Sequence, residues 1–306
     1  VKGVYYVLAL PTLSVSFMLT IKKKLPQNAP LEMEMQQHGS QKIFTTEFGK
    51  FLNKLMNKEN FAFSRFSDGE LYMLKGERLV LAENSYITGA LQGHGVYPKE
   101  EQKDFDPKRD KFYQEKLVEA LQYRKKNYYK GLTGVVDEDI AGKGAFQFQL
   151  DLCGEGDDEH LTYSNVFINN NYPKFIEKMM PILSQKEIVF IANEAATFDK
   201  LPLTVIKHFK VGRNCIINDF NLVEDIKVWI KENNIKDKVF LFSASTLSNY
   251  IIHECFKECD ENTYIDIGTC LSPWMGLDGW KYTRAYLQHW VLGRHNKYGT
   301  QVDTWI

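Results

Sequence analysis

The sequence has few cysteines and lacks the common spaced motifs of metal and nucleotide sites. Its five cysteines, Cys153, Cys215, Cys255, Cys259 and Cys270, form no C-x-x-C pair, so a zinc or disulfide framework is not indicated. We expect reduced packing residues and a reducing compartment. H-E-x-x-H, G-x-S-x-G, G-x-G-x-x-G and G-x-x-x-x-G-K-[ST] are all missing. These absences count against zinc hydrolases, α/β-hydrolases, NAD-binding enzymes and P-loop enzymes.

The chain also lacks an excess of either charge. It has 38 basic and 39 acidic side chains in 306 residues, for a net charge of -1. A nucleic-acid binder normally shows a basic excess or stripe, so we predict no nucleic-acid partner and expect small molecules or neutral polymers instead. With 44% hydrophobic and 25% charged residues, the composition is that of a globular protein and excludes a disordered chain.

One long uncharged segment stands near the beginning. Residues 4–21 carry no charge and precede Lys22, Lys23 and Lys24, which makes them a candidate membrane anchor. Pro11 and several hydroxyl residues dilute the segment, so a buried strand is the alternative. If the segment spans a membrane, the three lysines favour a cytoplasmic location for the domain after it. The lumen of the Golgi or ER is the alternative location for that domain. Residues 25–42 are polar and predict a tether, which makes 1–42 an N-terminal extension and 43–306 the main domain.

The remaining chain predicts a Rossmann-like α/β fold, a parallel sheet flanked by helices. The spacing favours helices over 44–56 and 107–126, the second with Phe112, Leu117 and Leu121 inward, and a loop over 137–159. From about residue 161, apolar runs at 188–193, 215–219, 239–246 and 264–268 alternate with helical patterns, the first of them continuing to Phe209. Such alternation is typical of βαβ units. Ligands of such sheets bind beyond the carboxyl ends of the strands.

The sharpest motif is the segment from Arg65 to Glu70, which reads R-F-S-D-G-E and follows a short apolar run. Asp68 and Glu70 are hard oxygen ligands that could hold Mg²⁺ or Mn²⁺ together with water and phosphate oxygens. Arg65 could add a bidentate phosphate contact. The structural alternative is a polar turn in which Asp68 caps the next helix.

Other polar residues lie within the predicted strands of the second half or at their ends. Ser243 and Ser245 lie at a strand-to-helix turn, where hydroxyls and free N–H groups bind anions. Asn193 ends the first run and is a candidate donor contact. Asp219 and Asp266 are candidate general bases, and each could equally cap or orient a neighbour.

These segments together resemble the glycosyltransferases of the GT-D type, a group first described as a domain of unknown function. The family's R-F-G-D-G-E signature holds a DXE motif, and here Ser67 replaces its first glycine. Ser-Ala-Ser stands where the family commonly has a G-P turn after its third strand. The resemblance covers about residues 44–276, with a DXE-bearing half to about 160 and the Rossmann-like half from about 161. It also rests on later segments: 162–168, 218–219, 242–245 and 264–268.

The resemblance implies a hexosyl- or pentosyltransferase that uses Mn²⁺ or Mg²⁺. Carried over by position, Asp68 and Glu70 would be the metal and donor ligands. Arg65 and Ser67 are further candidate contacts of the nucleoside-diphosphate sugar, with UDP as the default nucleotide. The acceptor would be a glycan or glycoprotein. A bound cation would stabilise the negative charge that develops on the departing diphosphate. The alternatives are a non-catalytic nucleotide- or glycan-binding protein of the same fold, a metal-dependent phosphohydrolase and a methyltransferase.

Overall fold

The structure is a computed structural model that describes residues 34–37, 40–82, 85–88, 91–93, 102–134, 142–154, 159–168 and 171–277. The candidate membrane anchor at residues 4–21 lies outside these ranges. Among the described residues, no helix has the length and apolar character needed to cross a membrane. Within the segment predicted as a tether, Glu34–Gln37 (β1) and Ser40–Ile43 (β2) pair as an antiparallel hairpin.

A seven-stranded sheet organises the molecule, and every pairing in it is parallel. Each of the central strands is a run of buried residues, as expected for a sheet covered on both faces. In spatial order the strands are β11 (Thr204–Val211), β10 (Glu187–Asn193), β12 (Val239–Ser243), β13 (Thr263–Asp266), β3 (Ala62–Arg65), β8 (Tyr128–Leu132) and β9 (Leu161–Tyr163).

The strand order reverses between β3 and β13. From β3 the chain builds outward through β8 and β9, whereas the four strands of the second half lie on the other side of β3. Because all strands are parallel, their carboxyl ends meet at one edge of the sheet. In open α/β sheets this reversal marks the usual ligand-binding crevice. The end of β3, at Arg65, and the end of β13, at Asp266, therefore lie together at that place.

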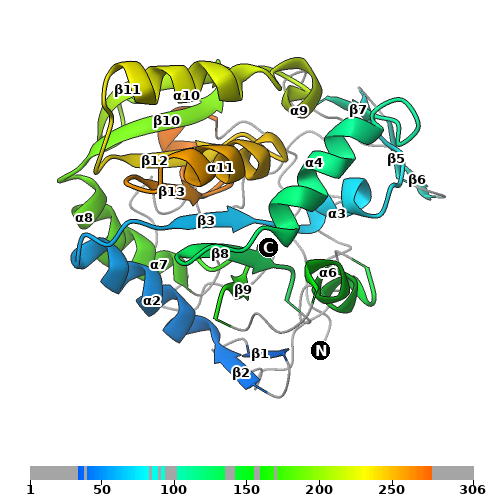
Figure 1. Ribbon diagram of the computed structural model, residues 1–306, viewed down its shortest axis with the longest axis horizontal. Helices are drawn as coiled ribbons and strands as arrows, with labels where there is room; N and C mark the ends of the chain where they lie inside the picture. Colours follow the sequence, from blue (N-terminus) through cyan, green and yellow to red (C-terminus); the bar gives the residue numbers. More distant parts are fainter. Residues whose placement is uncertain are drawn as a thin grey trace, which may run out of the picture.

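Helices cover both faces of the sheet (Figure 1). On β3 the consecutive residues Phe63 and Ser64 point to opposite faces: the Phe63 ring packs on Phe51, and the Ser64 hydroxyl accepts a hydrogen bond from Asn249. The first face carries α2 (Phe44–Met56) and the second α11 (Leu247–Glu258), which packs against α4 (Lys111–Gln122) and α10 (Leu222–Glu232). A further helical segment joins α7 (Tyr172–Lys174), a π-helical turn (Phe175–Met179) and α8 (Met180–Leu183).

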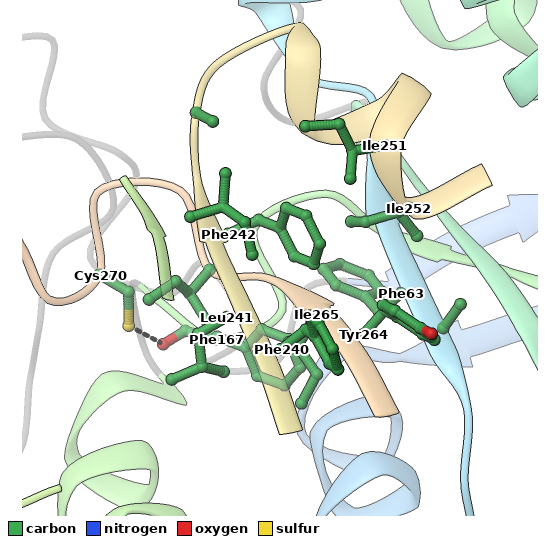
Figure 2. Close-up of a cluster of buried hydrophobic side chains, with 14 of the residues drawn as sticks. Phe63, Phe167, Phe240, Leu241, Phe242, Ile251, Ile252, Tyr264, Ile265 and Cys270 are labelled. Atoms are coloured by element: carbon green, nitrogen blue, oxygen red, sulfur yellow. Dashed lines mark hydrogen bonds between the residues drawn. The ribbon is translucent and has the colours of Figure 1, made fainter. Parts of the chain in front are cut away.

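The core is rich in aromatic side chains that interlock across neighbouring strands. Figure 2 shows Phe63, Phe240, Phe242 and Tyr264 gathered with Ile251 and Ile252 of α11, all of them buried. Phe240 and Tyr264 lie on adjacent strands with ring centroids 4.9 Å apart. Burial of such rings contributes on the order of 2–3 kcal/mol each, which makes the central strands a rigid platform for the residues at their ends.

A second, antiparallel sheet lies beyond the carboxyl ends of the parallel strands (Figure 1). It comprises β4 (Leu79–Ala82), β5 (Ser85–Thr88), β6 (Leu91–Gly93) and β7 (Lys103–Phe105), in the order β6-β5-β4-β7. The short helices α3 (Asp68–Leu74), α6 (Ala145–Cys153) and α9 (Cys215–Asn218) gather at the same edge. The 3-10 turn Ser272–Met275 follows β13.

The structure confirms the predicted fold class, and three of the four predicted strands of the second half form at 187–193, 239–243 and 263–266. Two local predictions are wrong. The run at 215–219 is helix α9, because Asn214 turns the chain with a φ of 51° and buries Cys215 and Ile216. The helix expected to continue to Phe209 is strand β11, whose β-branched residues pair along the edge of the sheet.

Two smaller predictions for the first half are also wrong. Phe112, predicted to point inward, is 51% exposed, while Leu117 and Leu121 are buried as expected. The predicted loop at 137–159 contains helix α6. The parallel sheet includes β3 and β8, which precede residue 160, so it is continuous across the predicted boundary between the two halves. The five cysteines, all within the described ranges, form no disulfide bond.

Candidate functional site

The segment from Arg65 to Glu70 joins the end of β3 to the start of α3. Ser67 precedes the first residue of α3 in an extended conformation, and its backbone N–H donates a 2.9 Å hydrogen bond to the Glu70 carboxylate. This is the contact of a capping box, which satisfies a backbone donor at the helix start. The Ser67 hydroxyl donates to Asp68 at 2.8 Å and accepts from the Arg65 guanidinium at 3.0 Å. One residue thus links both neighbouring charges.

The two carboxylates of this segment occupy different surroundings. Asp68 is exposed, whereas Glu70 is 4% exposed and engaged with Ser67. Burial raises the pKa of Glu70, and the positive charges of Arg65 and Lys103 oppose that rise. Gly69 between them has no positive φ and lies in the first turn of α3. Among the described residues, a Cβ at Gly69 would meet no atom within 4 Å, so the space beside this glycine is open.

Arg65 and Asp266 end the neighbouring strands β3 and β13. The Arg65 guanidinium packs over Gly268, where an added Cβ would lie 3.0 Å from Nη1 and where φ is +50°; both the backbone conformation and the close contact favour glycine at this turn. The Gly268 N–H donates to Asp266 at 2.9 Å. Asp266 is buried, and this burial, with the nearby Glu70 charge, raises its pKa to about 7 against the opposing charge of Arg65.

Two buried side-chain amides hold the backbone that carries these residues. Asn249, on α11, donates to the Arg65 carbonyl at 2.7 Å. Gln149, on α6, donates to the Phe66 carbonyl at 3.0 Å and accepts from the Thr133 N–H at 2.8 Å. Both amides are fully buried. Consecutive carbonyls at the end of β3 are therefore fixed from two different helices, which orients the side chains of the loop.

The hydroxyl residues of the β12–α11 turn lie beside this cluster. Ser243 ends β12 next to β13, and Ser245 adopts a φ of 49° in the turn. The Lys103 ammonium, from β7 of the antiparallel sheet, lies 2.6 Å from the Ser245 hydroxyl. Asn193 ends β10, one strand further out, and its side-chain carbonyl accepts from the Ala195 N–H at 2.8 Å.

Asp219 is tied to the end of the edge strand. It follows α9, and its carboxylate accepts a 2.8 Å hydrogen bond from the Gly212 N–H, just beyond the end of β11. β11 is three positions from β13 in the strand order, although α9 also reaches the β12–α11 turn, where the Cys215 thiol donates to the Ala244 carbonyl at 3.1 Å. The structure thus brings together Arg65, Ser67, Asp68, Glu70, Ser243, Ser245 and Asp266, and it places Asn193 and Asp219 further out, near the ends of β10 and β11.

A divalent cation fits this donor set in one particular way. Within the part of the chain that the structure describes, no group of three or more His, Cys, Asp or Glu side chains could hold a metal ion. Mg²⁺ and Mn²⁺ sites in sugar and phosphate enzymes commonly use one or two carboxylates, and the substrate phosphates and water complete the shell. Exposed Asp68 suits that arrangement, whereas Glu70 is turned toward the Ser67 N–H.

Comparison with known proteins gives a likeness of fold. No model of a protein family matches the sequence, and no curated protein matches it either. Two solved structures of the domain of unknown function 1792 superpose on the chain, one of them substituted with selenomethionine. Each gives a TM-score of 0.50 at 12% identity over 81% of both chains. That domain is described as highly conserved and as having a distinct glycosyltransferase fold.

Sequence reasoning did not find Lys103, Gln149 or Asn249. Lys103 belongs to a segment crowded with charges, and no local pattern distinguishes it from its neighbours. The two amides are single polar residues within helices, and only the tertiary structure places them against β3. A buried polar residue on an otherwise apolar helix face is the one signal that the sequence offered for Asn249.

Proposed function

We propose that this protein is a metal-dependent glycosyltransferase that moves a sugar from a nucleoside diphosphate, with UDP as the expected nucleotide, to a glycan or glycoprotein acceptor. The observation that carries the proposal is the position of the Arg65–Glu70 segment at the strand-order reversal, with buried Asp266 beside it. The fold shared with the domain of unknown function 1792 supports the same class of reaction.

In this proposal the role of each side chain follows from its exposure and its contacts. Asp68, exposed at the first turn of α3, would hold Mn²⁺ or Mg²⁺ against the diphosphate, and the cation would offset charge on the leaving group. Arg65 would donate hydrogen bonds to a phosphate oxygen. Glu70 would keep the loop in shape through the Ser67 N–H and would complete the metal shell only if it turned outward. Ser243 and Ser245 would contact the donor from the neighbouring turn.

Asp266 is the better general base of the two predicted candidates. Its pKa of about 7 lies near the working pH, where a base combines availability with strength. It also lies beside Arg65, whereas Asp219 is bound to Gly212 at the sheet edge. Asp266 would accept the proton of the acceptor hydroxyl as that oxygen attacks the sugar, the role expected in a reaction that inverts configuration.

The experiment is a ligand screen followed by a transfer assay. The melting temperature of the chain is measured with nucleoside diphosphates and their sugars, in Mn²⁺ and in EDTA, because a ligand of the folded state raises it. The Asp68→Asn variant should lose the metal-dependent shift and lower transfer by about 100-fold or more, since a bound cation supplies several kcal/mol. Asp225→Asn is the matched control, because Asp225 is also an exposed aspartate in the first turn of a helix.

The outcomes separate this proposal from its alternatives. Metal-dependent nucleotide binding without transfer would favour a binding protein of the same fold, and release of free sugar or phosphate without an acceptor would favour a phosphohydrolase. A melting shift with S-adenosylmethionine alone would indicate a methyltransferase. Full transfer activity in Asp68→Asn would overturn the metal assignment.

A further inference from the structure

Lys103 reaches the site from a different sheet. It begins β7 of the antiparallel sheet, which lies beyond the carboxyl ends of the parallel strands (Figure 1). Its ammonium lies 2.6 Å from the Ser245 hydroxyl, on the turn between β12 and α11. The next residue is also tied to the main sheet, because the Asn214 side chain donates to the Asp104 carbonyl at 3.1 Å. β7 is therefore held over the strand ends at two consecutive residues.

The charge of Lys103 acts on the same cluster as the charge of Arg65. Both cations oppose the rise in the pKa of buried Glu70, and Lys103 also opposes the rise in the pKa of buried Tyr72. Arg65 approaches from the end of β3 and Lys103 from the antiparallel sheet. Two cations from separate parts of the chain therefore act on buried Glu70.

Ser245 adopts a strained backbone conformation. Its φ of 49° places a residue other than glycine in the left-handed region, at a cost of about 1 kcal/mol or more. Such strain concentrates at ligand-binding sites, where surrounding structure enforces it. The turn leads directly into α11, a helix of 12 residues. A lysine ammonium beside a hydroxyl at the start of a helix provides donors and positive charge together.

We propose that Lys103 binds the diphosphate of the donor and neutralises the leaving group, with Ser245 as the hydroxyl that holds it in place when no donor is bound. This inference rests on the proposed glycosyltransferase function and adds a second cation to Arg65. The ligand class is a diphosphate, whatever base it carries, because ammonium and guanidinium groups recognise phosphate oxygens and not the base.

Transfer of the sugar from the diphosphate to the acceptor needs no further reactant. The bond between the sugar carbon and the phosphate oxygen breaks, and its electron pair stays on that oxygen. The acceptor oxygen forms the new bond to the sugar carbon and gives its proton to the Asp266 carboxylate. Lys103 keeps its own proton and donates a hydrogen bond to the departing diphosphate, which gains negative charge as the bond breaks.

The test compares ligands with and without phosphates. Binding of pyrophosphate, UDP and uridine, each with Mn²⁺, is measured by calorimetry for the full chain and for Lys103→Ala, Lys103→Arg and Lys108→Ala. Lys108 is an exposed lysine five residues away and controls for the lost charge. Lys103→Ala should weaken pyrophosphate and UDP by roughly 10- to 100-fold, the effect of one charge-assisted hydrogen bond. Uridine binding should not change, and Lys103→Arg should retain most of the affinity.

Each result decides the matter. If the unaltered chain binds UDP and pyrophosphate and Lys103→Ala binds them equally well, the role of Lys103 is wrong while the proposed function stands. If the unaltered chain binds no nucleoside diphosphate, both proposals fall. Equal losses in Lys103→Ala and Lys108→Ala would reduce the effect to net charge and would also overturn the inference. Unchanged melting temperatures of the variants would show that lost affinity is not lost folding.

Discussion

Asp219 and Asp266 look alike in the sequence but lie in different parts of the molecule. Asp219 ends the apolar run at 215–219, Asp266 lies within the run at 264–268, and both are candidate general bases. Asp266 ends a central strand beside Arg65 and Glu70, and its pKa is raised to about 7. Asp219 follows a short helix at the sheet edge and binds the Gly212 N–H. The comparison teaches that strand pairing, and not the local sequence, decides which polar residues become neighbours of Arg65 and Glu70.

The largest expected difference between these regions is in catalysis. Asp266→Asn removes the proposed base and should lower kcat by 10²- to 10⁴-fold, the usual contribution of general-base catalysis. Asp219→Asn keeps a hydrogen-bond acceptor for Gly212 and should leave kcat within about twofold. Steady-state transfer assays of both variants at saturating donor measure the contrast. Equal losses in the two variants would place Asp219 in the site and break the comparison.

The next effect is on stability as pH changes. The folded protein holds a proton on Asp266 up to about pH 7, whereas the ordinary value for this group is 3.8. Between these values the folded state binds more protons than the unfolded state, so the free energy of unfolding falls as pH rises. The expected decrease is on the order of 4 kcal/mol, and raised protonation of Glu70 acts in the same direction.

Urea unfolding at pH 4.5 and pH 7.5, in EDTA, measures this slope. Asp266→Asn should flatten it, because its amide does not titrate, while Asp219→Asn should leave it in place. A slope that is unchanged in Asp266→Asn would show that Asp266 is ionised in the folded protein throughout this range.

A smaller effect concerns the amides that hold β3. Asn249→Ala removes the hydrogen bond to the Arg65 carbonyl and should cost about 1–3 kcal/mol of stability, together with a lower kcat because the loop loses its orientation. Asn262→Ala is the matched control: Asn262 is also fully buried, with hydrogen bonds to Lys238 and Ile235 near the opposite end of β13. Its loss of stability should be similar and its kcat unchanged well below the melting temperature.

Asn249→Gln, assayed beside these variants, tests whether a longer amide restores part of the activity. Equal kcat in Asn249→Ala and Asn262→Ala would reduce Asn249 to a packing role, and the stability measurements would then account for both variants.

The smallest expected effect compares two helical glycines. A Cβ would meet nothing within 4 Å at Gly69 or at Gly49, among the described residues, and both lie in helices. Replacement by alanine should therefore stabilise the fold by about 0.5–1 kcal/mol at either position. Only Gly69→Ala should weaken donor binding, because its methyl group would enter the open space next to the proposed metal ligand Asp68 in the chain. Thermal unfolding measures the stability of both variants, and calorimetry with UDP measures their donor affinity. Equal donor affinity in the two variants would show that the donor does not come close to Gly69.

The sequence predicted the parts of the molecule that depend on local pattern. The apolar runs at 188–193, 239–246 and 264–268 became strands because continuous burial leaves a clear signature. The strand prediction for 215–219 is wrong because its three apolar residues suit a buried helical turn equally well, and the conformation of Asn214 favours the helix. The prediction missed β11 because exposed lysines separate the apolar residues of this edge strand, in a pattern that resembles one face of a helix.

The residues of the candidate site also differ in how far the local sequence could predict them. Asp68, Glu70 and Arg65 are adjacent in the chain, so a motif could reveal them. The different surroundings of Asp68 and Glu70, and the contacts of Lys103 with Ser245, arise from tertiary packing that no local pattern encodes. Asp266 was named from the sequence, but its nearness to Arg65 follows from the parallel pairing of β13 with β3.

The most direct test of the central claim is to locate the metal. Crystals of the full chain grown with UDP and Mn²⁺ give an anomalous signal for the cation. We predict a peak at about 2.1–2.2 Å from an Asp68 carboxylate oxygen, at the β3–β13 reversal, with the diphosphate between Arg65 and Lys103. A peak beside Asp219, or UDP bound with no cation near Asp68, would contradict the account.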